Sequence, residues 1–263
     1  VDGEQYFAAV ATALERARRE IFIAGWELTP EMYLRRRGAT PRAADRLDLL
    51  LQRKAMSGVR VYVLIWKETK LAQMGLFSAH SAQHLESLHA NIRVVRHPPS
   101  FPLNWAHHQK IVVVDQKLAF VGGLDLAFGR YDWHAHTLVD DCHVSTLWPG
   151  ADFYNQTRFA AANKREPFRC EHDRTAAFRQ PWHDVAMCVT GPAAQDVTRN
   201  FIQRWNHHRQ ASADAAHYRR LVPSALTEMA ELSPLSMISG GALRHFKNQC
   251  DDDEIGAAFS AAC

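Results

Sequence analysis

Two basic residues, His108 and Lys110, stand two positions apart at the beginning of an apolar stretch. Side chains two residues apart on a β-strand project from the same side, so we expect an imidazole and an ammonium group to lie together. A neutral imidazole nitrogen can attack phosphorus, and a lysine can hold a phosphoryl oxygen as a point charge. Because neither role requires a metal or another cofactor, the pair predicts metal-free phosphodiester chemistry.

Three further polar or flexible positions follow this pair. Asp115 comes seven residues after His108, and an odd offset turns a strand side chain to the other face. We therefore expect Asp115 to lie at a turn and to have a structural role. Gly122 and Gly123 permit a close backbone approach just beyond a second strand, and Asp125 follows two residues later. These three residues are expected to bind the substrate.

The elements that must position these residues alternate between helices and strands. Helical spacing of apolar residues, a candidate capping box at Asp2 and Gln5, and runs of β-forming residues predict three successive helix and strand units. The predicted strands are 21–26, 59–66, 92–96, 110–114 and 118–121, and the predicted helices start near 2, 44, 78 and 193. This order indicates an α/β fold in which a mixed β-sheet is flanked by helices.

Composition excludes several classes of protein. The chain has 263 residues, of which 47% are hydrophobic, and its formal net charge of +3 is too small to favour binding of nucleic acid through bulk charge. Five cysteines form no CxxC pair, which favours a reducing compartment over a disulfide framework. The fifteen histidines include His134, His136 and His143 near Asp132, but no common ligand spacing, so no metal site is expected.

The segment from Trp105 to Asp132 resembles the phospholipase D superfamily. Its HxKxxxxD signature is present as His108, Lys110 and Asp115, and Gly122, Gly123 and Asp125 match the downstream glycine element. Further stretches resemble the first catalytic half of eukaryotic phospholipases D, those that often have PX and PH domains. These stretches are WAHHQK, DQKLAFVGGLDLAFGRYD, PWHDV and NFIQRWN. The resemblance covers about residues 1–209, which are expected to form one lobe, followed by a weakly patterned, truncated or partly disordered segment at 210–263.

This resemblance implies a mechanism and roles for individual residues. His108 is implied to form a covalent phosphohistidine, and Asp140 in TLVDD occupies the place of the acidic residue that orients it. The histidine of a second signature, in the same chain or in another, is implied to protonate the leaving alcohol. The spacing of His245, Lys247 and Asp252 fits that signature, but it lacks the apolar strand and glycine element, so we do not expect it to be functional.

The implied reaction is hydrolysis of phosphatidylcholine to phosphatidate and choline by a cytoplasmic protein at a membrane surface. Activation by phosphoinositides is left open, and nucleic acid is not expected as a partner. The sequence begins at Val1, which suggests a piece of a longer protein. The alternatives are a superfamily nuclease, a transferase similar to cardiolipin synthase, and a catalytically inactive lobe that binds lipid.

Overall fold

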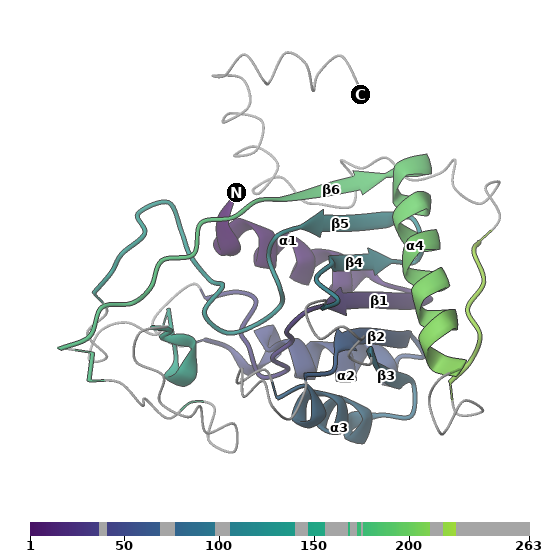
Figure 1. Ribbon diagram of the computed structural model, residues 1–263, viewed down its shortest axis with the longest axis horizontal. Coiled ribbons are helices and arrows are strands. Elements are labelled where there is room, and N and C mark those ends of the chain that lie inside the picture. Colours follow the sequence, from purple (N-terminus) through teal and green to yellow (C-terminus); the bar gives the residue numbers. More distant parts are fainter. Residues whose placement is uncertain are drawn as a thin grey trace, which may run out of the picture.

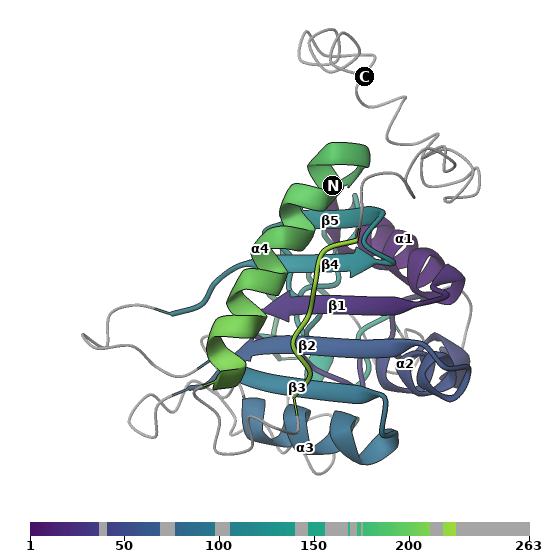
Figure 2. The ribbon, with the colours of Figure 1, turned by 90° about the vertical axis from the view of Figure 1, so that its right-hand side faces the viewer.

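The fold is built around a mixed β-sheet of six strands with helices on both faces (Figures 1 and 2). The computed structural model describes residues 1–36, 41–68, 77–97, 106–139, 147–155, 168, 173–174, 176–210 and 218–224. The strands are β1 (Glu20–Gly25), β2 (Arg60–Trp66), β3 (Ile92–His97), β4 (Lys110–Val114), β5 (Leu118–Gly122) and β6 (Ala186–Thr190). The helices are α1 (Asp2–Arg16), α2 (Leu47–Met56), α3 (Ser78–Leu88) and α4 (Gly191–Gln210), with 3₁₀ turns at Ala43–Asp45 and Gly150–Asp152.

The strand order β3-β2-β1-β4-β5-β6 brings the functional candidates to one end of the sheet. Strands β1, β2 and β3 are parallel, whereas β4 runs antiparallel to β1, with Ala24 opposite Ile111. The carboxyl ends of β1, β2 and β3 therefore lie beside the amino end of β4. We call this end of the sheet, from His97 through Trp66 and Trp26 to Lys110, the carboxyl edge.

Two apolar cores hold the helices against the sheet. Alternation along β1 sends Ile21 and Ile23 into the core under α1, α2 and α3, and sends Phe22 into the core under α4. On the α4 side, the ring of Phe201 stacks on Phe22 with centroids 4.8 Å apart. Because both faces of β1 are covered, all six of its residues are buried, and this explains its nearly continuous apolar sequence.

The structure confirms the predicted α/β class and the mixed sheet flanked by helices. It also adds β6, which pairs antiparallel with β5 and was not predicted. The capping box at Asp2 and Gln5 is wrong, because α1 has no side-chain cap and the Asp2 carboxylate instead accepts a hydrogen bond from His183 at 2.7 Å. Residues 225–263 lie outside the described part, so the expected domain boundary at 209 stays a prediction.

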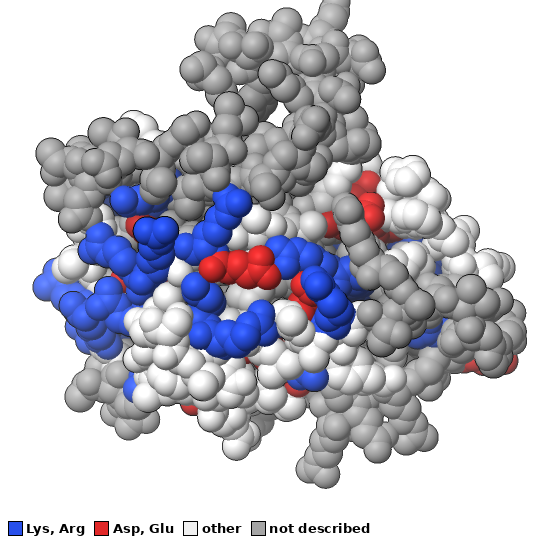
Figure 3. Space-filling view, turned by 180° about the vertical axis from the view of Figure 1, so that it is seen from behind, with Lys and Arg blue, Asp and Glu red and all other residues white. Residues whose placement is uncertain are grey.

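The outer surface of the layer formed by α1, α2 and α3 is strongly charged. Figure 3, which shows this layer from behind, has many lysine and arginine side chains with acidic side chains among them. Arg35 pairs with Glu15 at 2.7 Å, and Arg42 pairs with Asp45 at 2.8 Å. This mixture of signs is typical of a solvated face. Among the helices that the structure describes, none is both long and apolar enough to cross a membrane.

Candidate active site at the carboxyl edge

The imidazole of His108 and the ammonium of Lys110 lie against the same aromatic ring. The ring centroids of His108 and Trp26 are 5.5 Å apart, and Lys110 Nζ lies 6.0 Å from the Trp26 ring centroid. His108 is exposed and precedes β4, whereas Lys110 is the first residue of β4 and is buried. The edge therefore presents an accessible imidazole beside a sheltered cation.

Asp125 is the direct partner of Lys110. Lys110 Nζ lies 2.8 Å from Asp125 Oδ2, and the two side chains are only 5% and 3% exposed. Asp125 Oδ1 accepts a hydrogen bond of 2.9 Å from the backbone N–H of Trp26, so both carboxylate oxygens are engaged. In the described structure Asp125 thus fixes the ammonium group and ties β4 to the end of β1.

The surroundings of His108 favour its neutral form. Partial burial lowers the pKa of His108 below its ordinary value, and the positive charges of Lys110 and Arg130 lower it further, while Asp125 acts in the opposite direction. Burial also lowers the pKa of Lys110, and Asp125 opposes that shift. A neutral imidazole has a free electron pair at physiological pH, which is the form needed for attack on phosphorus.

Asp115 lies at the other end of β4, in the turn before β5. Its carboxylate accepts backbone hydrogen bonds from Arg18 at 2.9 Å, Arg19 at 2.7 Å and Glu20 at 2.9 Å. Four residues separate Asp115 from Lys110, which corresponds to about 16 Å along a strand. The carboxylate therefore anchors the beginning of β1 and does not meet His108 or Lys110.

The two glycines at the end of β5, Gly122 and Gly123, pack closely against this chain's own backbone and side chains. A Cβ atom on Gly122 would lie 2.4 Å from the carbonyl oxygen of Val185, next to β6. A Cβ atom on Gly123 would lie 2.2 Å from an Asp184 carboxylate oxygen. These approaches explain why neither position has room for a side chain. Contact of Gly122 and Gly123 with a substrate stays a prediction.

A second ion pair, between the buried Arg130 and the partly exposed Glu27, was missed from the sequence. Arg130 lies in the GRYD stretch, and its guanidinium is 2.8 Å from Glu27 Oε2 and stacks over the Trp182 ring at 4.4 Å. Arg130 lowers the pKa of both His108 and Lys110, which places its charge within electrostatic reach of both groups. Glu27 directly follows the predicted strand 21–26, but nothing in the sequence links Arg130 to it.

A group of histidines continues the carboxyl edge toward α4. The ring of His97 at the end of β3 stacks on His107 with centroids 5.4 Å apart, and His97 lies 3.9 Å from the ring of His208. Burial, reinforced by the positive charge of Arg204, lowers the pKa of His107 to about 3. Burial likewise lowers the pKa of His208 to about 4. His208, near the end of α4, is therefore half-buried against His97.

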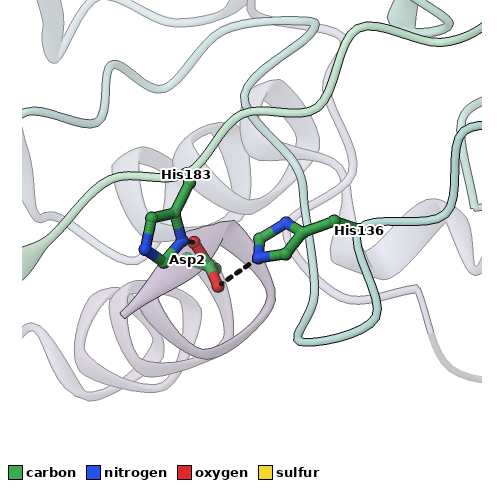
Figure 4. Close-up of side chains that lie close together, drawn as sticks. All are labelled: Asp2, His136 and His183. Atoms are coloured by element: carbon green, nitrogen blue, oxygen red, sulfur yellow. Dashed lines mark hydrogen bonds and ion pairs between the residues drawn. The ribbon is translucent and has the colours of Figure 1, made fainter.

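A histidine and aspartate cluster lies where the start of α1 meets two loops (Figure 4). His183 Nδ1 is 2.7 Å from Asp2 Oδ1, His136 Nε2 is 3.7 Å from Asp2 Oδ2, and His136 Nδ1 is 3.1 Å from the buried Asp132. One ligand atom from each of Asp2, His136 and His183 lies within 4.8 Å of the others. Two imidazoles and a carboxylate fit a divalent transition metal such as Zn²⁺, which the sequence did not predict.

Two predicted residues cannot be placed relative to these groups. Asp140, the expected orienting carboxylate, and His143 both lie outside the described residues. The same is true of the second signature pattern at His245, Lys247 and Asp252. Of the seven predicted site residues, the structure brings His108, Lys110 and Asp125 together, places Gly122 opposite Lys110 in the sheet, and separates Asp115 from them.

Comparison with known proteins links this chain to one family. The sequence model of the phospholipase D family matches residues 13–232. Phospholipase D A of Dictyostelium discoideum is 48% identical over 80% of this chain, and phospholipase D zeta 1 of Arabidopsis thaliana is 43% identical over 85%. The chain spans only 16% and 20% of the lengths of these two relatives. Among solved structures, Nuc from Salmonella typhimurium aligns over 47% of this chain and 66% of its own, with 18% identity and a TM-score of 0.34.

Proposed function

The chain belongs to the phospholipase D family, and on that premise we propose that it forms one catalytic lobe of a phosphodiesterase acting on phosphatidylcholine. The observation that carries this proposal is the placement of His108 and Lys110 against one ring, Trp26. The imidazole is exposed and biased toward its neutral form, and the ammonium is fixed beside it. Together they provide a nucleophile and a binding group for phosphoryl oxygen.

In the proposed reaction, a ring nitrogen of His108 attacks phosphorus and forms a P–N bond. The P–O bond to choline breaks, and a proton is transferred to the choline oxygen. Water then attacks the phosphohistidine, which releases phosphatidate and restores the imidazole. Lys110 holds a non-bridging oxygen throughout, and an ammonium group has three donors, enough to serve both Asp125 and the phosphate. Asp115 acts structurally, by anchoring β1.

Protonation of the leaving choline requires an acid, which we assign to the histidine of a second HxKxxxxD signature, in a second half of the same protein or in another chain. The much greater length of the relatives supports this assignment. We propose that Asp140 orients the His108 ring, that Gly122 and Gly123 border the bound phosphate, and that Asp125 acts on the substrate through Lys110. The protein is proposed to work from the cytoplasm at a membrane surface, with phosphoinositides as candidate activators.

The test is to trap the covalent intermediate. The purified chain, alone and with a separately expressed second half from a relative, is incubated with phosphatidylcholine vesicles labelled at phosphorus and quenched in alkali. We expect label on the wild-type protein and none on His108→Asn. A His134→Asn variant, which changes a histidine whose ring meets the Trp133 ring edge-on, should keep its label.

Three outcomes would change the proposal. Label that survives in His108→Asn excludes His108 as the nucleophile. Faster hydrolysis of DNA than of phosphatidylcholine would favour a nuclease. Binding of the vesicles without turnover, even with the second half present, would favour an inactive lobe that binds lipid.

A further inference from the structure

Lys110 and the three charged side chains near it form two ion pairs whose charges cancel. Lys110 pairs with Asp125 at 2.8 Å, and Arg130 pairs with Glu27 at 2.8 Å. All four side chains are at most 13% exposed. With His108 neutral, this part of the edge carries two positive and two negative charges. An anionic phosphodiester therefore meets separated charges of both signs and not a net positive site.

The carboxylates of Asp125 and Glu27 differ in their partners and in their exposure. Both oxygens of Asp125 have partners, Lys110 and the backbone N–H of Trp26, and its side chain is 3% exposed. Glu27 pairs with Arg130 through Oε2, and its side chain is more exposed, at 13%. Glu27 also raises the pKa of Lys110, so its charge is felt at the phosphate-binding ammonium. Of these two carboxylates, Glu27 is the more accessible.

A pair of stacked indole rings begins at the residue before Glu27. The preceding residue, Trp26, stacks on Trp66 with centroids 6.2 Å apart and an interplanar angle of 15°, and its ring also borders His108. Glu27 follows Trp26 in the chain, and its partner Arg130 lies over the Trp182 ring at 4.4 Å. A carboxylate near indole rings is suited to an organic cation, which is attracted both by the charge and by the faces of the rings. The combination lies next to the ammonium that would hold a phosphate.

We propose that Glu27 is a specificity-determining residue that favours zwitterionic phosphodiesters over anionic ones. This inference rests on the proposed function, because it requires that Lys110 binds the phosphate. Glu27 then attracts the positively charged part of the headgroup, while its negative charge opposes a headgroup that has none. The simpler alternative is that Glu27 only holds Arg130 in place, which would affect both classes of substrate equally.

The test compares two soluble diesters that differ in headgroup charge, glycerophosphocholine and glycerophosphoglycerol. Binding of each to the full chain is measured by NMR titration, and hydrolysis of the corresponding lipids in vesicles is measured with the second half present. For Glu27→Gln we expect the preference for the choline compound to fall about tenfold, through weaker binding of the zwitterion and stronger binding of the anion. Glu31→Gln is the matched control, because Glu31 pairs with His80 at 2.9 Å instead of with the groups at His108.

The outcomes separate this inference from the proposed function. If wild-type protein hydrolyses phosphatidylcholine and Glu27→Gln changes both ligands by the same factor, the role of Glu27 in specificity is excluded while the proposed function stands. If wild-type protein neither binds the diesters nor hydrolyses the lipids, both ideas fail. Circular dichroism of Glu27→Gln and Glu31→Gln checks that the two variants remain folded.

Discussion

Lys110 Nζ and Asp125 Oδ2 lie 2.8 Å apart in a setting where both side chains are almost completely buried. Removing one partner of such a pair leaves an uncompensated buried charge, which costs more than the pair itself contributes. We expect Asp125→Asn to lower the free energy of unfolding by about 3 kcal/mol. Urea unfolding followed by tryptophan fluorescence measures this change.

The control for this prediction removes both charges at once. The Lys110→Met, Asp125→Asn double variant should be less destabilised than Asp125→Asn alone, because it leaves no charge unpaired and keeps the acceptor for the Trp26 N–H. Equal or greater destabilisation of the double variant would contradict the electrostatic explanation. Both variants should lose catalytic activity, since each disturbs the group that holds the phosphate.

Variants of Asp115 should change the stability of the protein without changing the site at His108. Asp115→Ala removes the acceptor of three backbone hydrogen bonds and places alanine at a φ of 53°, so we expect a loss of about 3 kcal/mol in unfolding free energy. Asp115→Asn should lose less, because asparagine tolerates this φ and keeps one acceptor oxygen. Histidine NMR titrations should give an unchanged pKa for His108 in the asparagine variant. A shifted His108 pKa would show that Asp115 acts on the site after all.

How much of the fold could be predicted from the sequence depends on the burial of each element. The strands β4 and β5 were predictable because four consecutive apolar residues, Ile111 to Val114, precede a polar turn and a second apolar run. The edge strand β6 was not, because Met187 and Cys188 are exposed and no alternation marks the strand. A strand that faces solvent has no burial pattern for the sequence to reveal.

The candidate site was predictable in its residues but not in its contacts. His108 and Lys110 are two apart, so strand geometry alone indicates that they lie on one side. Strand geometry does not predict the partners of Lys110 and Arg130. Asp125 and Glu27 are brought to these two residues by the order of the strands in the sheet. Asp125 was predicted to bind substrate, whereas its two oxygens bind Lys110 and the Trp26 backbone. Which carboxylate meets which cation is decided by the tertiary fold.

His107 should make the stability of the protein depend on pH. Its pKa is lowered to about 3 by burial, while an unfolded histidine titrates near 6.5, so only the unfolded state takes up this proton between those values. The contribution of His107 to stability is therefore complete above pH 6.5 and is lost as the pH falls toward 3. From pH 6.5 to 5 we expect a loss of about 2 kcal/mol from this residue.

Non-titrating variants isolate this contribution. Unfolding free energies of wild-type protein, His107→Gln and His207→Gln are measured from pH 7.5 to 5. The His107→Gln curve should be flatter than that of wild type, and the His207→Gln curve should follow wild type, because His207 is exposed. Parallel curves for wild type and His107→Gln would exclude His107 as the source of the pH dependence.

The cluster of Asp2, His136 and His183 should bind a divalent transition metal. The position of Asp132 supports this, since its carboxylate lies 3.1 Å from the second ring nitrogen of His136 and can orient the ring for a metal at Nε2. A bound ion would join the start of α1 to two distant loops, and a ligand that binds only the folded state raises the melting temperature. We expect Zn²⁺ to raise the melting temperature of metal-free wild-type protein and EDTA to reverse the rise. His136→Ala and His183→Ala should abolish the effect, whereas His134→Ala, two residues from His136 and outside the cluster, should retain it. An equal rise in all three variants would place the metal elsewhere.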